Sequence, residues 1–150
     1  MYIISECLIG HNCKYNGGNN RNENVIAFAK EHNCVFVCPE TAGGLPSPRP
    51  PAEQQMDHEG RILVRDKEGK DVTAEFIIGA EKCFEEATIA AKKAGEPIEG
   101  AILKAKSPSC GCEKIYDGTF SGTLKEGDGI FAAMLKNAGI PVSTEENLPR

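Results

Sequence analysis

The chain contains four short, mostly apolar runs, a pattern typical of strands that are buried on both faces of a parallel sheet. The runs are bounded by glycine, proline and asparagine, which are the residues that favour turns. We therefore expect strands at residues 2–7, 34–38, 101–104 and 140–143.

Apolar residues at helical spacing fill three of the segments between these runs. The first segment ends near His32 and follows an asparagine suited to an N-cap. The second and longest begins at Asp71 or Thr73 and stops at Gly95, where Pro97 follows closely. The third begins near residue 130 and ends before residue 139. Strands and helices therefore alternate along the chain, as in folds built on parallel sheets.

This alternation predicts an α/β fold, Rossmann-like, with a mostly parallel sheet and helices on both faces in three layers. A length of 150 residues suits one domain covering residues 1–150. Ile62–Arg65 suggests a small hairpin excursion. The proline-rich stretch Pro39–Pro51 predicts a rigid, irregular loop, and residues 115–129 predict a loop or an irregular hairpin.

Three cysteines lie where strands of this sheet end. Cys7 ends the first strand, Cys38 ends the second, and Cys110 follows the third. Ligands of open parallel sheets bind outside the carboxyl ends of the strands, because the crossover loops converge there. We therefore expect the three thiols to lie together at one edge of the sheet, although they are far apart in sequence.

We expect different positions and roles for the other cysteines. Cys34 should lie near the opposite end of its strand, and Cys83 on an apolar helical stripe should behave as a small buried hydrophobe. Cys13 and Cys112 each follow an edge cysteine closely enough to reach the same site. We expect Cys13 to be a neighbouring thiol rather than a ligand. For Cys112, the sequence leaves undecided whether it is a ligand.

Seven cysteines are many for a reducing compartment, and an odd number cannot pair completely, so metal or thiol chemistry is the leading explanation. Three thiolates can hold a 4Fe–4S cluster with one open iron, whereas four would close it for electron transfer. Zinc is the rival metal, but the paired C-x2-C spacing of structural zinc sites is absent. Glu40 and Ser107, which lie close to edge cysteines in sequence, are candidates for moving protons there.

Composition narrows the class of partner. A net charge of −5 and a pI near 5.3 argue against an extended grip on nucleic acid, so a small molecule is favoured. Local basic groups such as Arg49 and Lys104 remain available to attract it. The sequence shows no membrane span and no segment like a signal peptide, and from it we expect a cytoplasmic protein.

Five motifs now carry a resemblance to a known family. They are Cys7-Leu-Ile-Gly-x-x-Cys-x-Tyr-x-Gly-Gly18, Cys38-Pro-Glu-x-x-Gly-Gly-Leu-Pro-x-Pro-Arg-Pro-Pro-x-Glu53, Gly69-x-Asp-Val-Thr73, Ile102-Leu-Lys-x-x-Ser-Pro-Ser-Cys-Gly111 and Ile115-Tyr-Asp-Gly-Thr-Phe-Ser-Gly122. Together they span nearly the whole chain, which closely resembles the thiouracil desulfurases. The chain departs from the family pattern at Asn16, where an aspartate is common, and at Cys112, where no cysteine is expected.

The resemblance implies a 4Fe–4S enzyme that converts 2-thiouracil, or a related thiolated pyrimidine, to uracil and hydrogen sulfide without net electron transfer. It implies Cys7, Cys38 and Cys110 as cluster ligands, with the thiocarbonyl sulfur on the open iron. It implies Glu40 and Ser107 as the catalytic pair acting on the attacking water. Cluster-assembly machinery is then an expected partner. The alternatives are a carrier of sulfide or clusters without thiouracil turnover, and a zinc-stabilised binding module.

Overall fold

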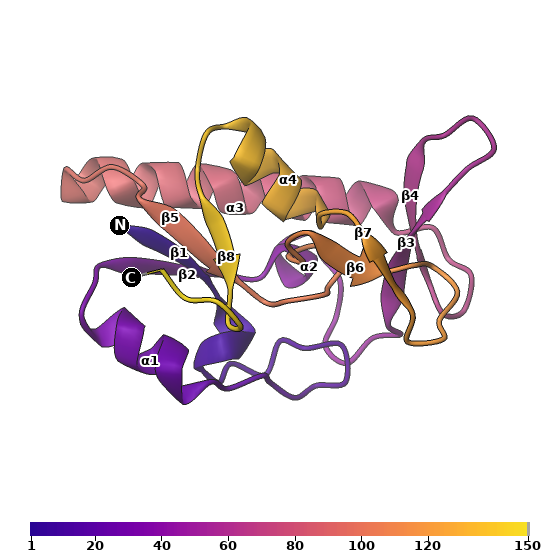
Figure 1. Ribbon diagram of the computed structural model, residues 1–150, viewed down its shortest axis with the longest axis horizontal. Helices are drawn as coiled ribbons and strands as arrows, with labels where there is room; N and C mark the ends of the chain where they lie inside the picture. Colours follow the sequence, from indigo (N-terminus) through magenta and orange to yellow (C-terminus); the bar gives the residue numbers. More distant parts are fainter. Residues whose placement is uncertain (150) are drawn as a thin grey trace.

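The computed structural model describes residues 1–149, and a four-stranded parallel sheet lies at its centre (Figure 1). The strand that begins at Tyr2 is an inner strand of this sheet. Its Tyr2 pairs with Cys34 of the strand on one side and with Gly100 of the strand on the other. The predicted α/β class with a mainly parallel sheet is confirmed. In spatial order the strands are β2 (Cys34–Val37), β1 (Tyr2–Ser5), β5 (Gly100–Leu103) and β8 (Val142–Thr144).

Helices cover both faces of this sheet, because neighbouring residues of a strand point to opposite sides. Ile3 and Leu103 belong to a core that includes residues of α3 (Thr73–Ala94) and α4 (Ile130–Asn137). Ile4 and Ile102 pack instead with Val25 of α1 (Glu23–Lys30). Figure 1 shows α3 and α1 on opposite sides of the strands. The predicted three layers are therefore present.

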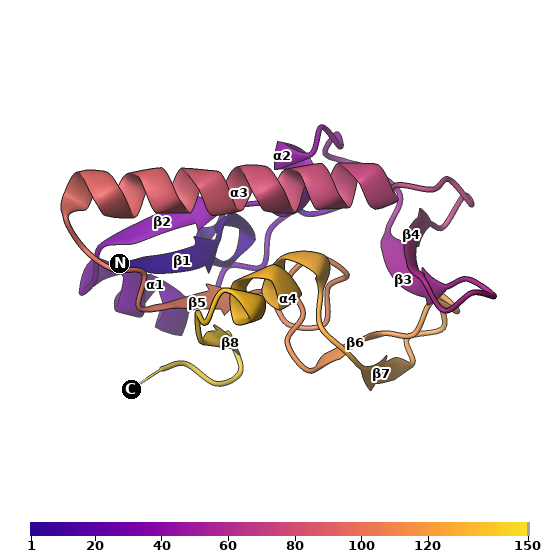
Figure 2. The same ribbon diagram turned by 90° about the horizontal axis from the view of Figure 1, so that it is seen from above.

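Two antiparallel hairpins lie beyond the carboxyl ends of the parallel strands (Figure 2). The first joins β3 (Ala52–Met56) to β4 (Ile62–Asp66), so the excursion expected at residues 62–65 is the second strand of a hairpin. The second joins β6 (Lys114–Tyr116) to β7 (Leu124–Glu126) in the segment expected to be a loop or an irregular hairpin. The hairpins extend the molecule at the end where the strand-end cysteines lie.

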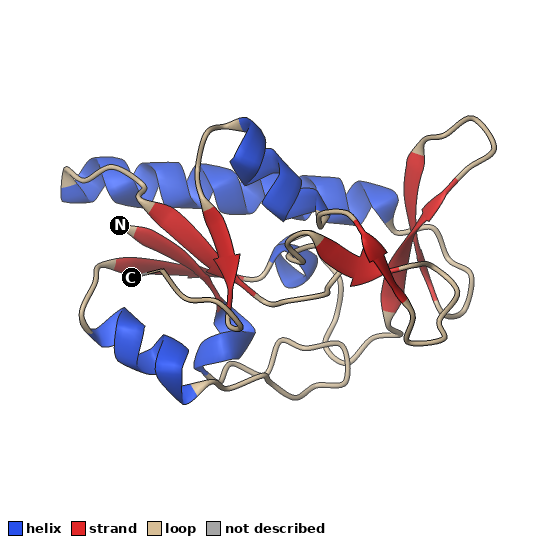
Figure 3. Ribbon diagram, viewed as in Figure 1, coloured by secondary structure: helices blue, strands red, loops and turns tan. Residues whose placement is uncertain are grey.

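Two local expectations differ from the structure at this end of the sheet. The first strand stops at Ser5, and Glu6–Ile9 forms a 3₁₀ helix that Gly10 ends in a left-handed conformation, so Cys7 lies in a turn. Pro39–Ala42 forms a one-turn helix, α2, within the stretch expected to be irregular. Proline suits the first turn of a helix because its missing N–H has no partner to lose there. Most of the remaining loop is irregular (Figure 3).

The helix starts also refine the sequence expectations. Asn22 caps α1, since its side-chain oxygen accepts the N–H groups of Asn24 and Val25. The N-cap of α3 is Val72, with Asp71 accepting hydrogen bonds from the backbone N–H and the hydroxyl of Thr73. Among residues 1–149, none of the helices has the length and apolarity that a bilayer crossing requires.

Helix α2 packs directly against α3 at two glycines. A Cβ atom at Gly79 would lie 1.7 Å from the carbonyl oxygen of Pro39, and one at Gly43 would lie 1.9 Å from that of Glu75. Only glycine permits backbones to approach so closely. The contact fixes the one-turn helix that carries Glu40 against the longest helix of the fold.

Candidate functional site

A cavity of about 440 Å³ opens at the carboxyl ends of the parallel strands, and Cys7, Cys38 and Cys110 all line it. Cys7 comes from the 3₁₀ helix after β1, Cys38 directly follows β2, and Cys110 lies in the loop after β5. The fold thus brings together the three cysteines that the strand ends singled out. The volume lies in the range of small-molecule and cofactor sites.

Cys13 lines the same cavity and contacts two of these cysteines. Its buried thiol lies within hydrogen-bonding reach of the sulfur atoms of both Cys7 and Cys38. This contact is the main cause that lowers the pKa of Cys7, and it lowers the pKa of Cys38 to about 6 with help from Thr41. The pKa of Cys13 is raised in return, because it is the proton donor of the group.

The remaining cysteines lie elsewhere. The thiol of Cys112 points to the carbonyl oxygen of Val142 at 3.6 Å, and Cys112 is not among the residues that line the cavity. Cys34 begins β2 at the other end of the sheet, as expected. Cys83 lies on the buried face of α3, in the core, where burial raises its pKa to about 12. Of the two cysteines that sequence left within reach of the site, only Cys13 reaches the cavity.

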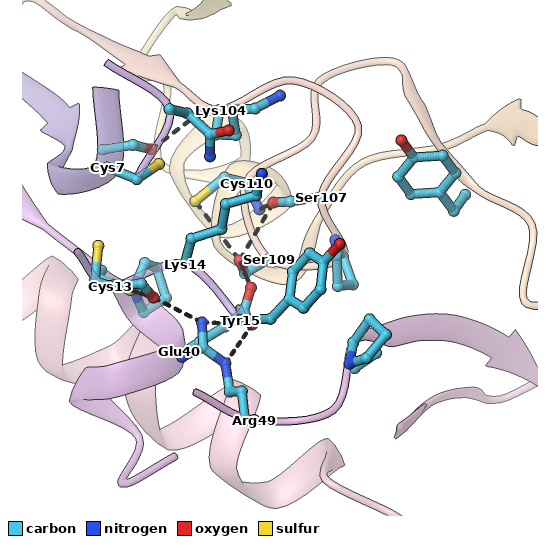
Figure 4. Close-up of a pocket in the computed structure, with 18 of the residues that line it drawn as sticks. Cys7, Cys13, Lys14, Tyr15, Glu40, Arg49, Lys104, Ser107, Ser109 and Cys110 are labelled. Carbon is cyan, nitrogen blue, oxygen red and sulfur yellow. Dashed lines mark hydrogen bonds and ion pairs between the residues drawn. The ribbon is translucent and has the colours of Figure 1, made fainter. Parts of the chain in front are cut away.

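Glu40 enters the cavity from α2 and is paired with a buried arginine. Arg49 Nε donates to Glu40 Oε1 at 3.2 Å, Nη2 forms an ion pair with the same oxygen at 3.1 Å, and the arginine side chain is 6% exposed. Nη2 also donates to the carbonyl oxygen of Cys13 at 2.9 Å. The guanidinium therefore joins the carboxylate to the loop that carries Cys13, as Figure 4 shows. A rigid planar fork suits arginine to such multiple contacts.

The second oxygen of Glu40 is bound by a serine that the sequence reasoning did not single out. Ser109 donates from Oγ to Glu40 Oε2 at 2.8 Å, and the same hydroxyl lies 3.7 Å from the sulfur of Cys110 (Figure 4). Ser107 also lines the cavity, but its Oγ accepts the backbone N–H of Cys110 at 2.8 Å and lies 3.4 Å from Ser109 Oγ. The only sequence signal for Ser109 was its place in Ser107-Pro-Ser-Cys110, between residues already chosen.

The loop that carries both serines is fixed on its far side. The N–H groups of Gly129 and Phe131, at the start of α4, donate to the carbonyl oxygens of Gly111 and Ser109. A Cβ at Gly129 would lie 2.5 Å or less from backbone atoms of this loop. Gln54 of β3 adds a hydrogen bond from Nε2 to the carbonyl oxygen of Pro108 at 3.0 Å. The hydroxyls and the thiol therefore project from a tightly held backbone.

One basic side chain brings a positive charge close to the thiols of the cavity. Lys104 lines the cavity, and its charge is one of the causes that lower the pKa of Cys7. Its Nζ is held 3.0 Å from Glu145 Oε2, while Glu145 Oε1 accepts the N–H of Ala105 at 2.7 Å. Burial acts in the opposite direction at Cys110 and raises the pKa of that thiol. Bound iron or a positive neighbour is needed to hold Cys110 as a thiolate.

The arrangement of the thiols can be tested against the needs of a metal cluster. Within residues 1–149, no three side chains of His, Cys, Asp or Glu converge closely enough to hold one ion. Cys7, Cys38 and Cys110 instead stand around an open volume. Cysteine thiolates are the usual ligands of iron–sulfur clusters. The donor set therefore fits a 4Fe–4S cluster held by these three cysteines.

Two known proteins resemble this chain over almost its entire length. The protein YbbK of Bacillus subtilis (strain 168) is 39% identical over 153 residues, which cover 99% of this chain and 97% of YbbK. The solved structure of the [4Fe-4S]-dependent thiouracil desulfidase TudS superposes with a TM-score of 0.80 at 41% identity, covering 99% of this chain and 92% of TudS. Both matches therefore extend over nearly the whole of this chain.

A model of one protein family matches residues 2–147, which include every residue of the cavity described above. The family is described as 2-thiouracil desulfurase. The resemblance inferred from the sequence motifs is confirmed by this match and by the structural similarity to TudS. The chain belongs to the 2-thiouracil desulfurase family.

Proposed function

We propose that this chain is a single-domain, 4Fe–4S-dependent enzyme that removes sulfur from 2-thiouracil or a related thiolated pyrimidine. The observation that carries the proposal is that Cys7, Cys38 and Cys110 line one cavity together with Glu40, which two side chains hold in place. The family match supports the reaction, and the solved relative supports the cofactor.

The cluster ligands in this proposal are the three cysteines from three different strand ends. A 4Fe–4S cluster held by three thiolates supplies an iron that acts as a Lewis acid toward the sulfur of a thiocarbonyl group. Cys13 is then a thiol neighbour of the ligands, close to both Cys7 and Cys38. Cys112 plays no part at the cluster, because its thiol is directed to Val142.

Glu40 is the proposed general base. Both of its oxygens accept hydrogen bonds, from Arg49 on one side and Ser109 on the other, and its side chain is 15% exposed. These donors fix the direction of the carboxylate, so that it can accept a proton from a water molecule in the cavity. A base held in one orientation loses little entropy when the reaction begins.

The two serines have separate proposed roles. Ser107 accepts the N–H of Cys110, which orients the cysteine, and its hydroxyl is 3.4 Å from that of Ser109. Ser109 in turn reaches Glu40 Oε2. The three groups form a chain of hydrogen bonds along which a proton of the attacking water can be passed. Ser107 assists the water, as the family resemblance implies, and Ser109 links it to Glu40.

The overall reaction is a hydrolysis. The oxygen of one water molecule forms the new C=O bond, the carbon–sulfur bond breaks, and both protons of the water leave with the sulfur as hydrogen sulfide. No electron is gained or lost. We further propose a cytoplasmic location and cluster delivery by assembly machinery, since exposed iron–sulfur clusters and seven free cysteines suit a reducing compartment.

The test is turnover by anaerobically reconstituted protein. Iron and acid-labile sulfide are measured first, and 2-thiouracil is then supplied while uracil and hydrogen sulfide are quantified. We expect both products in equal amounts from protein with four irons per chain, and none from metal-free protein. Activity in metal-free protein would contradict the proposal. Sulfide release to an acceptor without uracil would instead identify a carrier.

A further inference from the structure

One wall of the cavity contains a buried carboxylate that the proposed chemistry does not use. Glu53 lies in β3 opposite Arg65, is 8% exposed, and lines the cavity. It stands on the hairpin wall rather than among the residues of α2 that carry Glu40. A carboxylate is rarely buried without partners, because removing it from water is costly.

Only one of the two oxygens of Glu53 has such partners. Oε1 accepts the backbone N–H groups of Gly118 at 2.9 Å and Phe120 at 3.2 Å. Within residues 1–149, no hydrogen bond or ion pair involves Oε2. The one side-chain oxygen or nitrogen in that range that is fully buried and unpaired belongs to Glu75. Oε2 of Glu53 therefore has no protein partner among these residues, and Glu53 is one of the residues that line the cavity.

The walls of the cavity suit a flat ring. Tyr15, Tyr116 and Phe120 line the same cavity. Phe120 has a φ of 57°, an uncommon conformation for a residue with a side chain, and its N–H is one of those bound by Glu53. The carboxylate thus also fixes the loop that presents this aromatic ring. Aromatic faces and a few fixed polar groups are the usual composition of a small-molecule site.

We propose that Glu53 Oε2 accepts a ring N–H of the pyrimidine base and so determines which bases are bound. This inference rests on the proposed function for its ligand. Thiouracil carries N–H groups at N1 and N3, and the product uracil keeps both. A base alkylated at the recognised nitrogen leaves Oε2 buried without a partner, which lowers the affinity roughly tenfold to hundredfold.

The variant that tests the acceptor role of Oε2 most directly is Glu53→Gln. Because the two backbone N–H groups require an acceptor, the amide oxygen takes the place of Oε1 and the amide NH₂ replaces Oε2 in the cavity. The loop keeps its hydrogen bonds, but a donor then faces the N–H of the base. Glu59→Gln removes the same charge from the exposed turn of the β3–β4 hairpin and is the matched control.

Binding of uracil to reconstituted protein is measured by calorimetry, with iron content as a check on the cluster and hydrogen exchange of Gly118 and Phe120 as a check on the loop. We expect at least a tenfold higher Kd for Glu53→Gln and an unchanged Kd for Glu59→Gln. The comparison of 1-methyl- and 3-methyl-2-thiouracil then identifies the nitrogen. The unmodified protein should discriminate against one of them, and Glu53→Gln should not.

The outcomes separate this inference from the proposed function. Equal binding of uracil by Glu53→Gln and the unmodified protein overturns the role of Glu53, even if thiouracil is desulfurised. Equal binding of both methylated bases and 2-thiouracil overturns it as well. Uracil binding that depends on Glu53 in a protein without turnover supports the inference and overturns the proposed function. A protein that neither binds uracil nor turns over thiouracil overturns both.

Discussion

Arg49 Nε donates a hydrogen bond to Oε1 of Glu40 at 3.2 Å, and Nη2 forms an ion pair with the same oxygen at 3.1 Å. The guanidinium is nearly inaccessible to solvent, and it also binds the carbonyl oxygens of Cys13 and Pro46. One side chain thus connects the proposed base, the loop with the fourth cavity cysteine and the proline-rich loop.

Arg49→Lys should lower kcat while leaving iron content unchanged. A lysine keeps the charge but cannot bind Glu40 and the carbonyl oxygen of Cys13 from one planar group. Loss of a charge-assisted hydrogen bond costs about 1.5–3 kcal/mol, which corresponds to a roughly tenfold to hundredfold fall in kcat. Steady-state kinetics and iron analysis check this. Arg61→Lys, at an exposed arginine, is the control and should behave like the unmodified protein.

Ser109→Ala and Ser107→Ala should fail in different ways. Ser109 binds the proposed base, so its loss should lower kcat about tenfold at full cluster occupancy and similar KM. Ser107 binds the backbone of Cys110, so its loss should also change the visible spectrum of the cluster or reduce iron content. Normal kcat in Ser109→Ala would show that the hydrogen bond to Glu40 has no role in turnover.

The cysteines should divide into two groups on substitution. Cys7→Ala, Cys38→Ala and Cys110→Ala should each abolish the cluster and the activity, because each removes one of three ligands. Cys13→Ser should keep the four irons, since serine retains a hydrogen-bond donor beside Cys7 and Cys38.

Cys112→Ser is the companion of Cys13→Ser and should match the unmodified protein in iron content, spectrum and activity, because its thiol is directed to Val142. Iron analysis and electron paramagnetic resonance of reduced protein provide the measurement. Loss of one iron site in either serine variant would show a fourth protein ligand and would contradict the open-iron proposal.

Gly79→Ala should destabilise the fold although alanine is the better helix former. In an exposed helix this change would stabilise by about 1 kcal/mol. Here the added Cβ would lie 1.7 Å from the carbonyl oxygen of Pro39, so α2 must move. We expect a loss of about 1–3 kcal/mol in the free energy of unfolding, measured by urea denaturation. Glu81→Ala, on the exposed side of the same helix, should change it by less than about 0.5 kcal/mol.

The fold class was predictable from the sequence because its signals are local and periodic. Apolar runs marked the strands, and the stripe that ends at Gly95 marked α3 with nearly its observed bounds. The one-turn helix at Pro39–Ala42 was missed, because proline-rich sequence favours loops and a single turn has too few residues for a periodic pattern. The end of the first strand was predicted two residues too late, because the short 3₁₀ helix that follows Ser5 also has too few residues for a periodic pattern.

By itself, the sequence also determined that Cys7, Cys38 and Cys110 meet at one edge, since parallel strands direct their ends to the same side. The tertiary structure alone decided that Cys13 and not Cys112 reaches the cavity, and that Arg49 and Ser109 hold Glu40. It also decided that one oxygen of Glu53 has no partner among residues 1–149. Such contacts join residues that are distant along the chain. Their existence depends on how loops and hairpins fold over the sheet, and no local pattern in the sequence encodes those distances.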